Sequence, residues 1–197
     1  MCGRFTLHTP ESRLREVFKL DQSESLGLVP RYNIAPSQLV PMIRDTDAGR
    51  EMVMTTWGLV PHWSKESNTR YSTINAWKVI DGRKVPHHIR MRDGGVFALA
   101  GRWDRREGDG ESLDSCSIIV MPANNVMKTL HERMPAIIAP ANYDLWLDRS
   151  VSDKNEIMGY LDSSPSSRLV TYPVSSRVNS PMHDDKHCIE PAANLSD

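Results

Sequence analysis

The sequence predicts an α+β fold, in which a twisted, partly closed, barrel-like antiparallel β-sheet carries peripheral helices. Two observations predict it: apolar or alternating runs of strand length recur along the chain, whereas apolar patterns of helical period are few and short. At 197 residues with 39% hydrophobic side chains, the chain can bury one core of ordinary size. We place a single domain at residues 1–191 and a short tail at 192–197.

The first predicted element is a strand at residues 2–7, where side chains alternate in character. Phe5 and Leu7 would face the core, and Cys2 and Arg4 would share the opposite face, because successive side chains of a strand point to opposite sides. The alternation therefore sets Cys2 and Arg4 side by side on a face that does not enter the core.

The remaining elements follow in order. A helix is predicted to begin at Thr9-Pro10-Glu11, since proline is favoured in a first turn, and an apolar stripe ending at Val17 and Phe18 continues it. A polar turn at residues 45–50 separates two strands. The other expected strands are 39–43, 52–57, 96–103, 117–120 and 170–174, and the other expected helices are 123–130, 143–147 and 151–161.

Composition excludes several classes of protein. Three cysteines are too few for a secreted disulfide scaffold, and an odd number cannot all pair with one another. The cysteine count therefore indicates a reducing compartment. No leader pattern opens the sequence and no apolar run reaches membrane-spanning length. We therefore expect an intracellular protein without a membrane partner, in the cytoplasm or nucleoid of a bacterium or in the nucleus of a eukaryote.

Charge is balanced overall, with a formal net charge of −1, but it is uneven along the chain. Residues 83–106 carry seven lysines and arginines against only Asp93 and Asp104. Because salt screens charges beyond about 10 Å, a local basic patch can hold phosphates even on a neutral molecule. The alternative is an ordinary solvated basic face, which charge alone favours.

Cys2 directly follows the initiator methionine, so removal of Met1 would leave an amine and a thiol on one residue. Their ordinary pKa values are about 8 and 8.5, so a minority of each is nucleophilic at neutral pH. The amine can condense with an aldehyde, and the thiol can close on the imine carbon to give a thiazolidine. Such intramolecular attack can reach an effective molarity of roughly 10⁵ M. The alternative is that Cys2 is an ordinary residue of a frayed terminus.

Seven sequence fragments, taken in order, resemble the SOS response-associated peptidase (SRAP) family of abasic-site-processing proteins. The likeness runs from residue 1 to about residue 191, and the fragments in register make it specific. They are MCGRF (1–5), RYNIAP (31–36), WGLVPHW (57–63), INA (74–76), FALAGRW (97–103), HERMP (131–135) and VNSP (178–181).

The resemblance implies an SRAP-like fold and a monomer that binds single-stranded DNA, captures the aldehyde of an abasic site as a thiazolidine crosslink and removes its own Met1. No cofactor or metal is implied. By position in the motifs, the catalytic residues would be Cys2 as nucleophile, Asn75 near the imine or sugar, and His131 as a proton donor to the sugar oxygen. The implied DNA-binding residues are Arg4, Asn33, Trp63 and Arg133.

Each of these residues has a simpler interpretation. His131 could be a surface histidine at a helix end, and Asn75 a turn residue. Trp63 could be buried in the core, as Trp57 on its strand is expected to be, and Arg133 could pair with a neighbouring acid. The stretch 183–188 is rich in His, Asp and Cys, but it lacks the ligand spacing of a known zinc site, so we interpret it as a polar tail.

One departure from the family pattern concerns a catalytic glutamate. In the family, Ile-Asn-Ala is followed by arginine, a long segment and a strand ending in Glu-Trp; here Ala76 is followed directly by Trp77. The arginine, the segment and the glutamate are absent from this chain. Two interpretations follow: a covalent crosslinker of abasic DNA, or an impaired member that at most binds single-stranded DNA.

Overall fold

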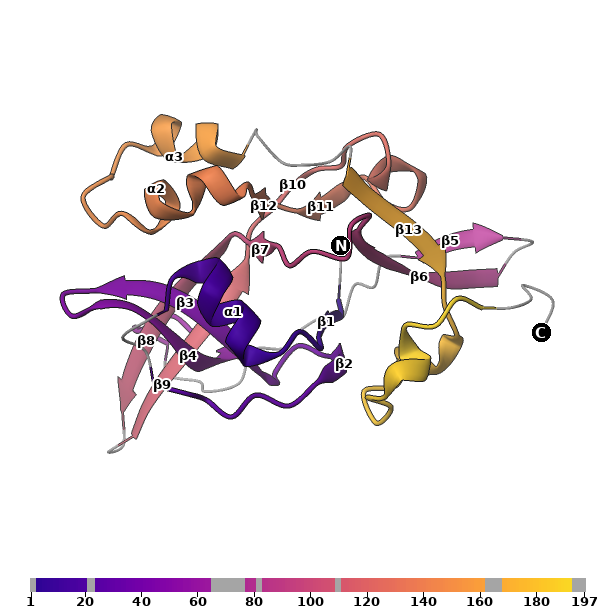
Figure 1. The fold of residues 1–197 in the computed structure, drawn as a ribbon, viewed down its shortest axis with the longest axis horizontal. Helices are drawn as coiled ribbons and strands as arrows, with labels where there is room; N and C mark the ends of the chain where they lie inside the picture. The colour runs from indigo at the N-terminus through magenta and orange to yellow at the C-terminus, as the bar shows by residue number, and fades with distance from the viewer. Residues whose placement is uncertain are drawn as a thin grey trace.

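The computed structural model describes residues 3–20, 24–64, 77–80, 83–108, 111–161 and 168–192, and strands dominate it (Figure 1). The helices are α1 (Glu11–Phe18), α2 (Tyr143–Leu147) and α3 (Lys154–Leu161). The strands are β1 (Phe5–Leu7), β2 (Arg31–Ile34), β3 (Leu39–Thr46), β4 (Gly49–Trp57), β5 (Trp77–Ile80), β6 (Arg83–Met91), β7 (Ala98–Leu99), β8 (Gly101–Gly108), β9 (Glu111–Ile118), β10 (Val120–Pro122), β11 (Arg133–Pro135), β12 (Ile137–Ile138) and β13 (Leu169–Pro173). Short 3₁₀ turns are η1 (Met127–Thr129), η2 (Pro140–Asn142), η4 (Ser176–Asn179) and η5 (Lys186–Cys188).

The largest sheet has four strands in the order β3-β4-β9-β8. β3 and β4 form a hairpin whose turn ends at Gly49, which has a φ of 112° that other residues rarely adopt. β4 joins β9 in parallel over Thr56 and Trp57, and the long β8–β9 hairpin completes the sheet. This sheet lies on the left of Figure 1.

A second sheet has the order β13-β6-β5 and lies on the opposite side of the molecule (Figure 1). Three two-stranded sheets, β1-β2, β10-β11 and β12-β7, complete the described part of the chain. The α+β class is confirmed. Within the described residues the sheets remain separate and open, so the barrel-like closure is only partial.

The main core packs α1, α2 and the end of α3 against strands β3, β4, β7 and β12. Its buried members include Leu14, Phe18 and Leu20 from the α1 region and Tyr143 from α2. Phe18 and Tyr143 touch with ring centroids 5.0 Å apart. The predicted apolar stripe of the first helix therefore faces the core as expected.

Most predicted elements are confirmed within a few residues, but the helix expected at 123–130 is wrong. Only the 3₁₀ turn η1 forms there, inside the loop of the β10–β11 hairpin. The side chain of Asn124 accepts a hydrogen bond from the backbone N–H of Met127 at 2.9 Å, and an asparagine bonded in this way favours a turn over a continuing helix. Strands β2, β5, β6, β11 and β12 were not predicted, and β6 contains the charged and histidine-rich start of the basic stretch.

No helix in the described part of the chain is long and apolar enough to cross a membrane.

Candidate functional site

The predicted nucleophile Cys2 and the predicted Asn75 both lie outside the described residues. The described neighbour of Cys2 in the chain is Gly3, which is buried and lines a cavity of about 1190 Å³. The structure therefore describes the predicted N-terminal strand only from Gly3 onward.

Arg4 holds the backbone beside Cys2. Its guanidinium donates one hydrogen bond to the carbonyl of Gly3 at 2.8 Å and another to the carbonyl of Asn179 at 3.1 Å. Burial lowers the pKa of Arg4. Two of its nitrogens are thus committed to the protein backbone, which ties the N-terminal strand to the C-terminal segment.

Cys2 is the remaining candidate for a reactive thiol, because the other two cysteines are buried. Cys116 and Cys188 are free thiols and are buried. Burial raises the pKa of Cys116 to about 11 and also raises that of Cys188. Since the thiolate is the nucleophilic form, neither is suited to covalent chemistry at neutral pH.

Asn33 is fully buried, which corrects the expectation that it contacts DNA from the wall of a cleft. Its amide donates to the carbonyls of Ser180 and His183, at 2.9 and 2.7 Å. Asn33 therefore connects β2 to the C-terminal segment from the inside, and its side chain is not available to a ligand.

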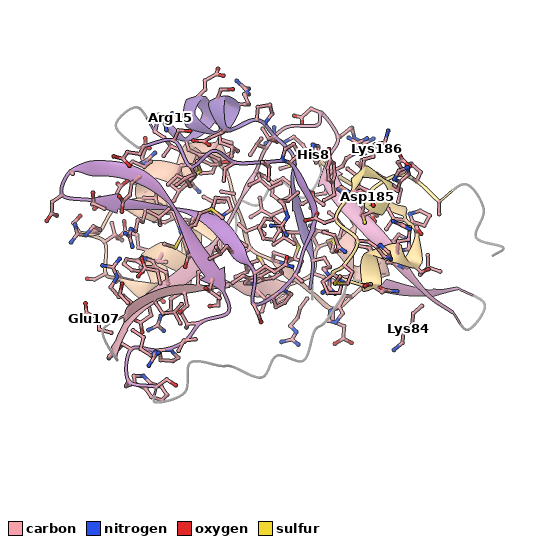
Figure 2. The ribbon with its side chains drawn as sticks, turned by 90° about the horizontal axis from the view of Figure 1, so that it is seen from below. His8, Arg15, Lys84, Glu107, Asp185 and Lys186 are labelled. Carbon is pink, nitrogen blue, oxygen red and sulfur yellow. The ribbon has the colours of Figure 1, made fainter. Side chains whose placement is uncertain are left out.

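The stretch 183–188 is also not a polar tail, because it is anchored on β2. Asp184 accepts hydrogen bonds from the backbone N–H groups of Tyr32 and Asn33, at 2.5 and 2.7 Å, and from the Arg31 guanidinium. Burial opposes ionisation of Asp184, but these donors outweigh it and lower its pKa. Figure 2 shows the next two residues, Asp185 and Lys186, on the yellow C-terminal segment near His8 at the end of β1. In the described ranges no group of three or more His, Cys, Asp or Glu side chains could hold a metal ion.

His131 lies at the base of the β10–β11 loop and is half-buried. The loop is closed by the backbone bond from Ala123 N–H to the Glu132 carbonyl at 2.9 Å, and the buried side chains of Met127 and Leu130 anchor it. The Nδ1 atom of His131 is 3.0 Å from the backbone N–H of Arg133, which donates to it. His131 is therefore held by a fixed loop rather than by a fraying helix end.

The surroundings of His131 determine the charge state of its ring and which ring nitrogen carries the proton. Burial, then the positive charges of the amino terminus and of Arg133, lower its pKa. Because Nδ1 accepts a hydrogen bond, the proton of the neutral ring is assigned to Nε2. Near pH 7 the neutral ring can donate a hydrogen bond from Nε2 to a bound oxygen.

The remaining predicted contact residues are accessible. Arg133 is exposed, and within the described residues no ion pair holds its guanidinium. Trp63 is 75% exposed, so the interpretation of Trp63 as a core residue is wrong. Trp57 is buried against Phe5 with ring centroids 5.5 Å apart, as expected for a core residue.

The basic stretch does not form one patch, because its two halves belong to different sheets. Lys84 of β6 and Glu107 of β8 lie at opposite sides of the molecule (Figure 2), which agrees with the positions of these strands in Figure 1. Arg105 is paired with Asp114 through two nitrogens, at 2.6 and 2.8 Å. This stretch therefore cannot form a phosphate-binding surface as a whole, and such a surface would have to combine residues from different parts of the fold.

Two pairs of rings on the cavity wall were missed by the sequence analysis. His8 stacks on Tyr32, and His88 lies against Tyr172, each with centroids 5.4 Å apart. Burial, the charge of Arg90 and that of His8 lower the pKa of His88 to about 4. In the sequence, the two adjacent histidines at 87 and 88 were the only signal of these ring pairs. No local pattern predicted their position opposite β1.

Known proteins show the same organisation. The family model described as SOS response associated peptidase (SRAP) matches residues 1–78 and 77–181. The abasic site processing protein YoqW of Bacillus subtilis is 30% identical over 222 residues, which cover 96% of this chain and 99% of YoqW. The abasic site processing protein HMCES of Gallus gallus is 25% identical and covers 97% of this chain and 78% of its own. A crystal structure of a protein from Bacteroides thetaiotaomicron has the same fold, with a TM-score of 0.78, 20% identity, and coverage of 97% of this chain and 100% of that one.

The comparisons also bear on the length of the chain. The alignment with YoqW spans 222 residues, more than the 197 of this chain, so YoqW carries residues that this chain lacks. The two matches to the family model meet at Trp77 and Lys78. This is the position at which the sequence analysis placed the absent segment.

Proposed function

This chain belongs to the SOS response-associated peptidase family, and we propose on that basis that it processes abasic sites in DNA by forming a covalent crosslink through Cys2. The observation that carries the proposal is the family match, which extends over both halves of the chain and includes the Cys2 and His131 motifs. The enclosure of Cys116 and Cys188 supports Cys2 as the reacting thiol.

The proposed reaction begins with hydrolysis of the Met1–Cys2 peptide bond, which frees the amine of Cys2. The amine adds to the aldehyde carbon of the ring-opened abasic sugar, and loss of water gives an imine. The thiolate of Cys2 then adds to the imine carbon while the nitrogen takes a proton, which closes the thiazolidine ring. The net change joins one aldehyde to one aminothiol with release of one water molecule.

His131 would assist ring opening of the sugar. With its proton on Nε2, the ring can donate a hydrogen bond to the ring oxygen of the closed sugar and so polarise the C–O bond that breaks on ring opening. The backbone bond from Arg133 fixes the ring plane, so the donor does not have to be ordered at the moment of reaction. In this proposal Asn75 hydrogen-bonds near the imine, as its motif implies.

Single-stranded DNA would bind through exposed groups. Arg133 offers an exposed guanidinium fork to a phosphate, and Trp63 offers a ring on which an unpaired base can stack. Arg4 would act mainly by holding Gly3, because both terminal nitrogens of its guanidinium donate to backbone carbonyls and its Nε atom is buried. The inward-facing Asn33 would support this surface from behind.

The second candidate function is single-stranded DNA binding without efficient chemistry. It is favoured by the meeting of the two family matches at Trp77 and by the greater length of YoqW, since the family glutamate falls in the absent segment. Without this glutamate as a placed acid or base, proton transfers at the imine would lose a contribution of roughly 10²–10⁴-fold. Both candidates predict binding, and only the first predicts a rapid crosslink.

The deciding experiment is an intact-mass measurement of the protein before and after incubation with an abasic single-stranded oligonucleotide. The crosslinking function predicts loss of Met1 and an adduct that survives denaturation. Cys2→Ser should lose the stable adduct but keep an imine that borohydride traps, because the amine remains. A serine variant with an undiminished stable adduct would exclude the thiazolidine, and DNA binding with no adduct in either protein would favour the second candidate.

A further inference from the structure

The loop that carries Trp63, residues 58–64, leaves β4 and runs past β9 to reach β8, the edge strand of the four-stranded sheet. It begins at Gly58, whose φ of 145° is one that other residues rarely adopt. The backbone N–H of Gly58 donates to the Cys116 carbonyl at 2.7 Å. The N–H of Val60 donates to the Ser115 hydroxyl at 2.8 Å, and that hydroxyl donates to the Val60 carbonyl at 3.2 Å. The first half of the loop is therefore fixed on β9.

Asp104 of β8 holds the second half of the loop. Its Oδ2 atom lies 3.0 Å from the backbone nitrogen of His62 and 3.0 Å from Nδ1 of the His62 ring. Because a carboxylate only accepts hydrogen bonds, both nitrogens of His62 donate to it. Its Oδ1 atom accepts from the backbone N–H of Arg105 at 2.9 Å. Asp104 and Ser115 are direct partners in the β8–β9 pairing, so the two side chains that hold the loop come from neighbouring positions.

The contacts of Asp104 also fix its charge. The hydrogen bond from the His62 ring, and then the one from the His62 N–H, lower the pKa of Asp104. Asp104 is therefore ionised at neutral pH, and its carboxylate accepts hydrogen bonds through both oxygens. In the sequence, Asp104 was only one of the two acids that interrupt the basic stretch 83–106.

Trp63 follows His62 directly and combines an exposed ring with a fixed backbone. Its side chain is 75% exposed. The turn that contains it is closed by the N–H of Ser64, which donates to the Pro61 carbonyl at 2.9 Å. Ordering a loop opposes binding, and a segment that is ordered beforehand avoids this cost. The loop therefore presents the Trp63 ring on a support that is in place before any ligand arrives.

We propose that Asp104 is a positioning residue for single-stranded DNA binding, and that its hydrogen bonds to His62 hold Trp63 where an unpaired base stacks on it. The inference rests on the proposed function, in which Trp63 contacts DNA. It adds a residue that acts through the loop 58–64 rather than by touching the nucleic acid.

The charge of Asp104 and its hydrogen bonds have opposite effects on DNA binding, which makes the proposal testable. A carboxylate near a DNA backbone repels the phosphates, so loss of the charge alone should strengthen binding. Loss of the hydrogen bonds releases the loop and should weaken binding. Asp104→Ala removes both the charge and the acceptor, whereas Asp104→Asn removes the charge and keeps a carbonyl oxygen for His62. A positioning role therefore predicts weaker binding for the alanine variant only.

The experiment measures the affinity of the full chain for a fluorescent single-stranded oligonucleotide without an abasic site. Trp63→Ala should weaken binding by roughly 5- to 100-fold, the loss expected for one stacked base. Asp104→Ala should weaken it about fivefold or more, and Asp104→Asn should bind at least as tightly as the natural chain. Asp93→Ala is the matched control, because it removes the other acid of the stretch 83–106 and its 2.9 Å hydrogen bond from the Gly95 N–H. That variant should not weaken binding.

A double-mutant cycle shows whether Asp104 acts through Trp63. Once Trp63 is alanine, Asp104→Ala should change the affinity less than twofold, because the ring that it positions is gone. Without DNA, Asp104→Ala should speed hydrogen exchange of the His62 amide at least tenfold, whereas Asp104→Asn should not. Binding of Asp104→Ala that equals or exceeds that of the natural chain, a full further loss without Trp63, or unchanged exchange at His62 would each overturn the proposal.

Failure of this proposal is separable from failure of the proposed function. If Trp63→Ala weakens binding and Asp104→Ala does not, the DNA contact of Trp63 stands and only the positioning role is wrong. If Trp63→Ala binds as tightly as the natural chain, the stacking contact is wrong and the positioning role fails with it. The oligonucleotide carries no aldehyde, so neither result depends on the covalent chemistry of Cys2.

Discussion

His88 makes the stability of this protein sensitive to mildly acidic pH. It lies on β6 opposite Tyr172 of β13, and its Nδ1 atom is buried without a hydrogen-bond partner. Burial, then the nearby charges of Arg90 and His8, lower the pKa of His88 from 6.5 to about 4. The ring is therefore neutral in the folded protein at pH 7 and resists protonation as the pH falls.

The size of the effect follows from the difference between the folded and unfolded pKa values. Between pH 6.5 and pH 4 the unfolded chain binds a proton at His88 that the folded chain does not, so acid favours unfolding. The stability is intact above pH 6.5 and declines as the pH falls toward 4. At pH 5 the expected loss is about 2 kcal/mol, which is a large share of the 5–15 kcal/mol that typical domains have.

The assay is urea unfolding followed by tryptophan fluorescence at pH 7.5 and pH 5.0. The natural chain should lose about 2 kcal/mol more free energy of unfolding between these two values than His88→Phe, whose ring can keep the contact with Tyr172. His62→Phe leaves His88 in place and should retain the full loss. If the natural chain and His88→Phe lose the same amount, His88 is protonated in the folded state and the reasoning is refuted.

Three further predictions address binding, packing and the absent segment. Arg133→Ala should flatten the log–log salt dependence of single-stranded DNA affinity by about 0.7, one phosphate contact, whereas Arg149→Ala should not; equal slopes would remove Arg133 from the interface. Asp184→Ala should lower the free energy of unfolding by about 2 kcal/mol or more in urea titrations, because it leaves two backbone N–H groups and Arg31 without their acceptor; a loss below about 0.5 kcal/mol would show that the anchor is dispensable. A variant with the YoqW segment inserted between Ala76 and Trp77 should crosslink abasic DNA roughly 10²-fold or more faster and unfold at a higher temperature, and equal rates and melting would show that the glutamate is not needed here.

The sequence predicted the helices, strands and turns that depend on residues close together in the chain. The strand that contains Phe5 and Leu7, the apolar stripe that ends at Phe18, and the polar turn before β4 are local patterns, and each is found in the structure. The predicted alternation of burial along that first strand is not seen, because all three residues of β1 are partly buried. The helix expected at 123–130 failed because Asn124 bonds to the backbone of its own turn, and apolar spacing does not report that bond.

The site was less predictable because its supports are distant in the chain. Asp184 is about 150 residues from Tyr32 and Asn33, yet it accepts their backbone hydrogen bonds, and no local pattern connects the two segments. The same distance explains why Asn33, expected at a DNA surface, is buried under Ser180. The motifs marked positions that matter, but only the fold shows which of them face outward.

The structure separates the two parts of the proposed activity. The two residues proposed to contact DNA, Trp63 and Arg133, are exposed, so binding should survive in this chain. The chemistry depends on a free amine at Cys2, because an amine held in the Met1–Cys2 peptide bond cannot form an imine. Removal of Met1 thus precedes every later step, and it is a step in which the family glutamate is implied. The mass of the N-terminus therefore tests the first candidate function before any DNA is added: a chain that keeps Met1 cannot form the proposed imine, whatever the positions of His131 and Asn75.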